Sequence, residues 1–298
     1  MQLKLKKNLY SIDKNLLVKA GEAINDTVLD RAVEKARKIY LVKLKNTTIL
    51  KDIKKAFLDE RYAIIFSSKN AKQRILSVLG GISIPKTILA ELKNLKINFP
   101  YTYLHIIMIA PLAMRVALHK DVRGKFSLKR IGELCLAHDI GKSRISKRII
   151  NKKTPLTAKE YRILRMHPLI GHVLLHYYYG KEHSKYDFVS YEHHERLDGS
   201  GYPRRIKKMS LYSQLIAIID IFDALTSQRP YRSGTYSFRG AIDLLIDEAK
   251  KGRLNKRFVY SLIAFARHKQ PILKGMKVSK FSRDLPPEWN AYGKIARK

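Results

Sequence analysis

Seven histidines and aspartates lie on apolar helix faces or next to them, which is a placement typical of metal ligands. They are His105, His138, Asp139, His167, His193, His194 and Asp220. Taken alone, each has an ordinary interpretation, because single buried histidines are usually satisfied core residues and single buried aspartates usually cap a helix or pair with a base. Burying all of them unpaired would cost several kcal/mol. Metal coordination removes that cost, so the set predicts a metal centre.

The donor types narrow the choice of metal. Imidazole and carboxylate donors without a thiolate favour iron, manganese or zinc, because magnesium and calcium prefer oxygen ligands. Seven donors exceed one coordination shell, whereas a bridging carboxylate can hold two ions about 3.5–4 Å apart, as in phosphoester hydrolases. Asp139 directly follows His138 and is the natural bridge. The sequence therefore predicts two divalent ions that activate water for attack on a phosphoester.

Cationic side chains accompany these ligands. Lys142 follows the His138-Asp139 pair, and Arg229-Pro230-Tyr231-Arg232 presents two guanidinium groups held by a proline. An arginine fork suits bidentate contact with phosphate. Ordinary surface charge is the competing interpretation for all three cations in a chain with 60 basic residues. A metal centre nearby favours a role in phosphate binding.

A run of helices must position the ligands, because residues from about 100 to 268 show helical periodicity and no strand-like alternation. A helix over 131–138 places His138 on the core face of Ile131 and Leu134. Thr157 to Glu160 forms a capping box. It opens a helix that we expect to end at His167, before Pro168. A further helix over 210–226 carries Asp220 on its buried stripe.

The remaining segments divide the chain into four parts. Residues 1–80 are predicted to form a small α+β accessory or sensing domain, with a helix over 28–37 and strands at 39–42 and 63–66. Residues 81–99 form a helical connector, and 100–268 form the helical domain. The basic tail over 269–298 contains Trp289, the only tryptophan. The predicted fold class is mainly α, a helical domain with a metal centre preceded by the small α+β domain.

Composition constrains the setting. The formal net charge of +35 attracts polyanions such as nucleic acid, acidic membrane surfaces or phosphate-bearing ligands, although a general enrichment in solvated lysine explains it equally well. Cys135 is the only cysteine, which excludes a disulfide framework and fits a reducing cytoplasm. We find no membrane span and no signal peptide, so we expect a cytoplasmic protein.

Several motifs together resemble the HD-GYP domain, a subgroup of the HD phosphohydrolase superfamily. They are Tyr101 to His105, His138-Asp139-Ile140-Gly141-Lys142, His193-His194-Glu195, Asp198-Gly199-Ser200-Gly201-Tyr202-Pro203, Asp220 to Ser227 and Arg229 to Arg232. The resemblance covers roughly residues 100 to 268. It implies a helical fold with two or three metal ions, often iron and sometimes manganese. It also implies hydrolysis of cyclic di-GMP to pGpG or GMP.

The resemblance also implies roles for individual residues. His105, His138, Asp139 and Asp220 would hold one ion, and His167, His193 and His194 would hold the second, with Asp139 as the bridge. Lys142 would face the scissile phosphate. The substrate would be bound by Lys142, Gly201, Tyr202, Pro203, Arg229 and Arg232. We interpret Glu195 as a residue that orients a histidine ligand.

Two positions depart from the family pattern. Tyr101 stands where some members have a glutamate that recruits a third metal ion, so we expect two ions, most simply iron, with manganese as the alternative. Pro111 follows His105 inside the same predicted helix, where proline removes a hydrogen bond and bends the axis. The bend either displaces His105 or is tolerated.

Three functions remain open from the sequence. The leading hypothesis is a metal-dependent cyclic di-GMP phosphodiesterase, with related cyclic dinucleotides as further substrates. The second is a cyclic-dinucleotide sensor that signals to a protein partner through the N-terminal domain, with little turnover. A nucleic-acid binder is the least favoured, because no aromatic-interleaved basic helix is present. A homodimer is compatible with the sequence.

Overall fold

The computed structural model describes residues 3–36, 38–228 and 234–265. Within these residues the chain is mainly helical, as predicted. The α-helices are α1 (Asp26–Glu34), α2 (Thr48–Ala56), α3 (Lys69–Gly81), α4 (Lys86–Asn98), α5 (Pro100–Ala117), α6 (Leu128–Ala137), α7 (Lys147–Ile150), α8 (Ala158–Leu164), α9 (His167–Tyr179), α10 (Asp187–Glu192), α11 (Leu211–Thr226), α12 (Phe238–Lys250) and α13 (Lys256–Phe265). Short 3-10 helices are η1 (Leu44–Asn46), η2 (Glu60–Tyr62), η3 (Ile140–Arg144) and η4 (Gly180–Lys185).

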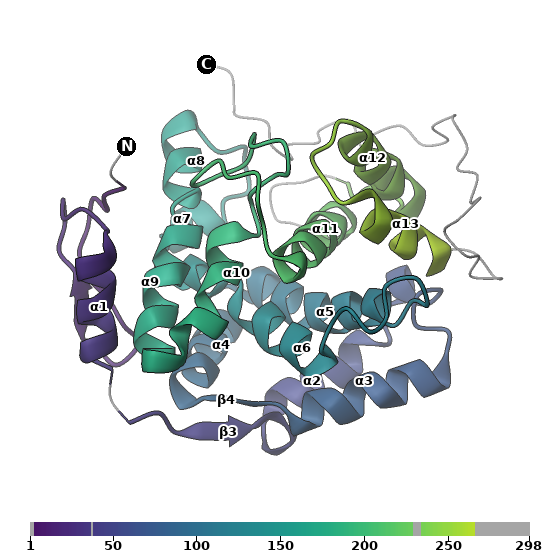
Figure 1. Cartoon of the computed structure of the whole chain (residues 1–298), viewed down its shortest axis with the longest axis horizontal. Helices are drawn as coiled ribbons and strands as arrows, with labels where there is room; N and C mark the ends of the chain where they lie inside the picture. Colours follow the sequence, from purple (N-terminus) through teal and green to yellow (C-terminus); the bar gives the residue numbers. More distant parts are fainter. Residues whose placement is uncertain (1–2, 37, 229–233, 266–298) are drawn as a thin grey trace.

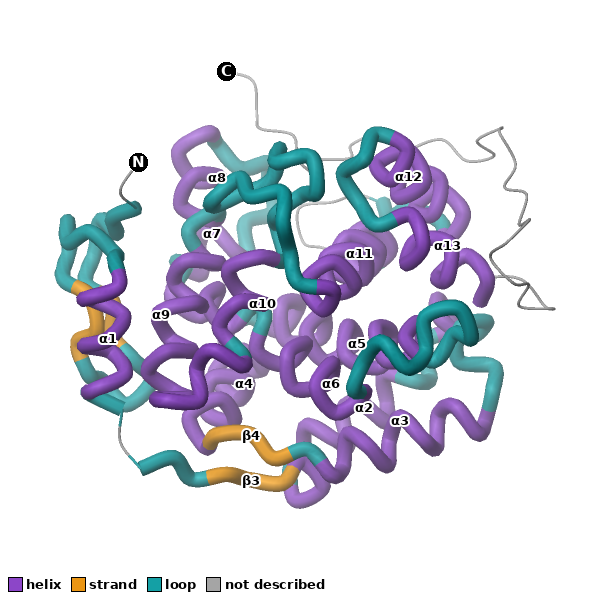
Figure 2. The backbone as a smooth tube through the Cα atoms, in the orientation of Figure 1, coloured by secondary structure: helices purple, strands orange, loops and turns teal. Residues whose placement is uncertain are grey.

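Strands occur only near the N-terminus among the described residues (Figure 2). β1 (Leu9–Tyr10) pairs with β2 (Leu16–Val18), and β3 (Leu41–Lys43) pairs with β4 (Ser83–Pro85), both antiparallel. The strand expected near residues 39–42 is therefore present. The strand expected at 63–66 is wrong. Those residues form turns after η2, and Ile65 and Phe66 are buried there by packing rather than by sheet pairing.

Helices α5 and α6 form the centre of the molecule, and other elements cover them on several sides (Figure 1). Nearly every residue of α5 is buried, because its sequence is apolar on all faces. Helices α2, α3 and α4 from the N-terminal part pack on α5, while α11 and α13 pack on it from the C-terminal part. One hydrophobic core extends from Leu5 to Phe265.

Pro111 does not break α5, which runs as one helix from Pro100 to Ala117. Of the two outcomes expected for this proline, the structure shows the tolerated one, since His105 still reaches the aspartate of α11. The energetic cost of the proline is accommodated in a helix that other helices cover on several sides.

The segment around His167 differs from the prediction. Thr157 and Glu160 form the expected capping box, but α8 ends at Leu164 and His167 begins the next helix. The physical reason is Pro168. Backbone N–H groups in the first turn of a helix have no partner within the helix. Proline has no N–H, so it costs no hydrogen bond there and is found more readily at the start of a helix than at its end. His167 therefore lies at the N-terminus of α9.

None of the helices in the described ranges is both long and apolar enough to cross a membrane.

Candidate metal centre

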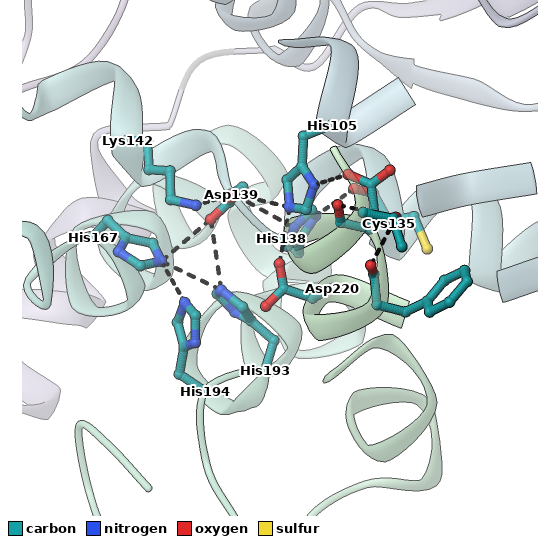
Figure 3. A network of polar contacts seen from close by, with 12 residues as sticks. His105, Cys135, His138, Asp139, Lys142, His167, His193, His194 and Asp220 are labelled. Atoms are coloured by element: carbon teal, nitrogen blue, oxygen red, sulfur yellow. Dashed lines mark hydrogen bonds and ion pairs between the residues drawn. The ribbon is translucent and has the colours of Figure 1, made fainter. Parts of the chain in front are cut away.

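The seven predicted ligands converge on one buried site, although they come from separate elements (Figure 3). His105 projects from α5, His138 caps the C-terminus of α6, and Asp139 precedes η3. The others are His167 at the start of α9, His193 and His194 after α10, and Asp220 in α11. Long-range packing alone brings these elements together.

His167, His193 and His194 form the first group of donors. The Nε2 atom of His167 lies 3.3 Å from Nε2 of His193 and 3.1 Å from Nε2 of His194. His167 and His193 are buried, while His194 is partly exposed. Three ring nitrogens facing one point are arranged as the ligands of one cation.

The second group contains His105, His138, Asp139 and Asp220. Nε2 of His105 lies 2.8 Å from Oδ1 of Asp220 and 3.9 Å from Oδ2 of Asp139. Nε2 of His138 lies 3.6 Å from the same Asp139 oxygen. The other Asp139 oxygen, Oδ1, faces the first group, 3.2 Å from Nε2 of His167. Asp139 thus lies between the two groups, where a bridging ligand belongs.

Backbone carbonyls fix the orientation of three rings. The Nδ1–H groups of His138, His167 and His193 donate to the carbonyls of Cys135, Leu164 and Val189, at 2.7, 2.7 and 3.0 Å. This leaves each Nε2 atom as an acceptor directed inward, which is the usual support for a metal-bound histidine. Nε2 of His138 is buried and has no hydrogen-bond partner. The donor set therefore fits metal ions.

Burial keeps three of these histidines neutral. It lowers the pKa of His138 to about 3 and that of His167 to about 4. Burial, followed by the neighbouring rings of His193 and His167, also lowers the pKa of His194 well below its usual value. Neutral imidazole is the form that binds metal, so these ligands do not have to lose a proton at neutral pH.

Asp139 is a buried, ionised carboxylate. Burial alone would raise its pKa, but the Lys142 ammonium and His138 hold it well below the usual range. Nζ of Lys142 lies 2.5 Å from Oδ2 of Asp139. Lys142 is only 14% exposed, so its charge is directed into the site rather than into solvent.

Asp223 is a residue of the site for which the sequence analysis gave no role. Its Oδ2 accepts from Nδ1 of His105 at 2.5 Å, and its Oδ1 accepts from the Tyr62 hydroxyl at 2.8 Å. Asp223 follows Asp220 by three residues on α11, so helical spacing could have indicated a shared face. Tyr62 could not have been found this way, because it is 161 residues away in sequence.

Gly141 explains how the segment after Asp139 fits against α9. A Cβ atom at this position would lie 2.0 Å from the His167 carbonyl oxygen and 2.6 Å from the Gly171 nitrogen. Only glycine permits this approach. The contact holds η3 against the N-terminus of α9 and so sets the spacing between Asp139 and His167.

The loop from Gly199 to Pro203 places Tyr202 over the first group of ligands. The Tyr202 ring stacks on His194, with centroids 4.7 Å apart, and the Arg165 guanidinium lies 4.2 Å from the centroid of the Tyr202 ring. Arg165 was not identified from the sequence. A Cβ atom at Gly201 would lie 2.4 Å from the Glu195 Cα, so this glycine allows the loop to close.

The interpretation of Glu195 as a histidine-orienting residue is wrong. Its buried carboxylate accepts from the backbone N–H groups of Arg204 and Arg205, at 2.7 and 3.1 Å. Glu195 therefore holds the end of the loop that carries Tyr202. Arg229 and Arg232 lie outside the described residues.

A cavity of about 830 Å³ opens beside His105 and Asp223. Residues of the N-terminal part and of α5 line it, including Arg61, Tyr101 and Tyr103. Tyr101 therefore faces this cavity.

Comparison with known proteins identifies the family. Residues 108–257 match the HD domain family, so the chain belongs to it. The chain is similar to a cyclic di-GMP phosphodiesterase of Pseudomonas aeruginosa, with 31% identity over 60% of this chain and 43% of the relative. It is also similar to a 3′3′-cGAMP-specific phosphodiesterase of Vibrio cholerae, with 32% identity over 64% of this chain and 42% of the relative. The chain thus spans less than half the length of these curated relatives.

Proposed function

We propose that this chain is a metal-dependent phosphodiesterase that opens cyclic di-GMP, giving pGpG or GMP, or opens a related cyclic dinucleotide. The observation that carries the proposal is the position of Asp139 between two groups of buried ring nitrogens. Relatives named as phosphodiesterases of cyclic di-GMP and of 3′3′-cGAMP support the substrate class.

Two divalent ions, with iron preferred and manganese as the alternative, are part of this proposal. His105, His138, Asp139 and Asp220 would hold one ion, and His167, His193, His194 and Asp139 would hold the other. Tyr101 supports two ions rather than three, because a phenol replaces a carboxylate there. When bound, the ions activate water and offset the negative charge that develops on the phosphoryl oxygens.

The protein's own groups bind and orient the substrate. Lys142 points at the centre, so its ammonium is placed to contact the scissile phosphate once the ions neutralise Asp139. The Tyr202 ring is held between His194, on which it stacks, and the Arg165 guanidinium, which leaves its hydroxyl edge available to a ligand. Gly201 and Pro203 shape this loop, and Arg165, Arg229 and Arg232 supply further positive charge for the phosphates.

The test is hydrolysis of cyclic di-GMP by protein purified without oxygen and loaded with iron or manganese. We expect turnover by the intact chain and a loss of at least about 100-fold in His138→Ala, since even outer partners of metal ligands cost about 10–100-fold. Tight binding without turnover by the iron-loaded chain would reject the proposal in favour of a sensor that passes the signal to a partner.

A further inference from the structure

A second cluster of metal-ligating side chains lies outside the centre described above. His172 and His176 occupy successive turns of α9, and Asp187 is the first residue of α10. One ligand atom from each of these three residues lies within 4.8 Å of the other two. His183, from η4, reaches the same carboxylate.

The geometry centres on one oxygen atom. Oδ2 of Asp187 lies 3.6 Å from Nδ1 of His172, 3.4 Å from Nε2 of His176 and 3.2 Å from Nδ1 of His183. Ligands about 2.0–2.2 Å from a tetrahedral zinc ion are separated from one another by roughly 3.4 Å. The three separations from Asp187 are close to the edge of such a tetrahedron.

Hydrogen bonds alone do not satisfy this cluster. Nδ1–H of His176 donates to the carbonyl of His172 at 2.9 Å, which makes Nε2 of the neutral ring an acceptor that faces a carboxylate. Nδ1 of His172 is buried and has no hydrogen-bond partner. Nε2 of His176 and Oδ2 of Asp187 are therefore two acceptors 3.4 Å apart, with the His183 Nδ1–H as the donor to this carboxylate, and a cation between them would offset their repulsion.

The surroundings favour a metal ion over a charged histidine. Burial lowers the pKa of His172 to about 3 and also lowers that of His176. The His172 ring stacks on Tyr191, with centroids 4.2 Å apart, and the His176 ring stacks on His183 at 4.0 Å. These contacts hold the rings in place, as the outer partners of metal ligands do.

We propose that His172, His176 and Asp187 bind a structural zinc-class divalent ion, with His183 completing the site. The donors are imidazoles and one carboxylate, which suit zinc. Copper, which binds such donors more tightly than zinc among the first-row divalent metals, would also fit them. The ion would tie α9 to α10 and η4. Helix α9 begins at His167 and α10 precedes His193, so the site would brace the two elements that carry the first group of ligands.

The test separates this site from the main centre by disabling the latter. In a full-length background that removes ligands from both groups of the main centre (His138→Ala, Asp139→Asn, His167→Ala and His194→Ala), metal-stripped protein is titrated with Zn²⁺ and, in parallel, with Co²⁺, whose visible absorption bands report tetrahedral coordination. We expect one equivalent of metal, tetrahedral cobalt bands and a rise in melting temperature of about 5 °C at saturating Zn²⁺.

Adding His176→Gln to this background should weaken Zn²⁺ binding at least about 100-fold and abolish the cobalt bands. His119→Gln is the matched control, because His119 is a buried histidine outside both clusters. It should leave one equivalent bound. Circular dichroism of the metal-free variants checks that each is folded.

Two results would overturn the proposal: no bound metal in the disabled background, or binding that His176→Gln leaves unchanged. Neither depends on hydrolysis, so failure here is distinct from failure of the proposed activity. In the otherwise intact chain, His176→Gln should lower the metal content by one ion per chain while two remain.

Discussion

At the residue scale, the fold points the histidine rings of the main centre inward and, for His138, His167 and His194, lowers the pKa so that they are neutral. The Nδ1–H groups of His138, His167 and His193 donate hydrogen bonds to backbone carbonyls. Main-chain atoms, and not other side chains, therefore fix the orientation of these three rings. Residue types and spacing were enough to identify the seven candidate ligands. They could not identify the carbonyl partners, because any residue supplies a carbonyl.

Neutral buried histidines make the metal-free protein sensitive to acid. The pKa is about 3 for His138 and about 4 for His167, against about 6.5 in an unfolded chain. Between pH 6.5 and 4 the unfolded state therefore binds protons that the folded state does not, and stability falls as pH falls. The melting temperature of metal-stripped protein should drop across this window.

The control for the acid effect is His138→Gln, which removes one of the depressed groups. Its melting temperature should depend less steeply on pH between 6.5 and 4. Below pH 4 both proteins should lose further stability, because the depressed pKa values of Asp139 and Asp220 then take effect. Equal slopes for the two proteins above pH 4 would contradict this account.

At the element scale, the sequence located several helices and the cap at Thr157, but not the contacts between the helices. The capping box at Thr157 and the helix that carries Asp220 followed from local pattern. The sequence analysis placed His167 at the end of one helix, whereas it begins the next, α9. The neighbouring Pro168 is compatible with the end of a helix as well as with its start. The turns at 63–66 resembled a strand because burial of Ile65 and Phe66 comes from tertiary packing.

A connection between η2 and α11 supports a ligand of the main centre. The Tyr62 hydroxyl donates to Asp223, which in turn accepts from His105. Tyr62→Phe should lower the affinity of the centre for its metal by up to about tenfold, since Tyr62 holds Asp223, the partner of the ligand His105, and is one contact further from the metal than Asp223. It should also destabilise the metal-free protein by about 1–3 kcal/mol, because the buried Asp223 carboxylate loses one of its hydrogen-bond donors.

Tyr103→Phe provides the matched control for this experiment. Tyr103 also donates its hydroxyl to an aspartate, Asp52, but that contact joins α2 to α5 and does not include a metal ligand. Both variants should melt at lower temperature, while only Tyr62→Phe should weaken metal binding in a competition titration. Similar metal affinities in the two variants would show that Asp223 does not need Tyr62.

At the scale of the whole molecule, the N-terminal part contributes to the same core as the helices of the metal centre. Arg115 of α5 is buried, donates from Nε to the Ile65 carbonyl at 2.9 Å, and lies 3.9 Å from the Phe265 ring centroid. Helices α2 and α3 pack on α5, and α3 also packs on α6. These contacts join residues that the sequence alone assigned to separate parts.

A chain that starts at residue 81 should therefore fail to fold alone. Removal of residues 1–80 exposes the apolar faces of α5 and α6. It also takes away the Ile65 carbonyl, to which the Arg115 side chain donates a hydrogen bond. We expect aggregation and no cooperative thermal transition by circular dichroism, with recovery when residues 1–80 are co-expressed as a separate fragment. A truncated chain with a sharp transition of its own would instead establish residues 1–80 as an independent domain.

The net charge of +35 belongs to the whole chain, and its effect on activity can be measured through salt. A cyclic dinucleotide carries two phosphodiester charges, so a positive field should speed its association, and added ions should screen that field. We expect kcat/KM for cyclic di-GMP to fall about tenfold from low to high NaCl while kcat changes little. A singly charged phosphodiester should show a shallower decline, and a non-ionic osmolyte should cause none. If both substrates are insensitive to salt, the lysines are solvated surface charge with no part in substrate capture.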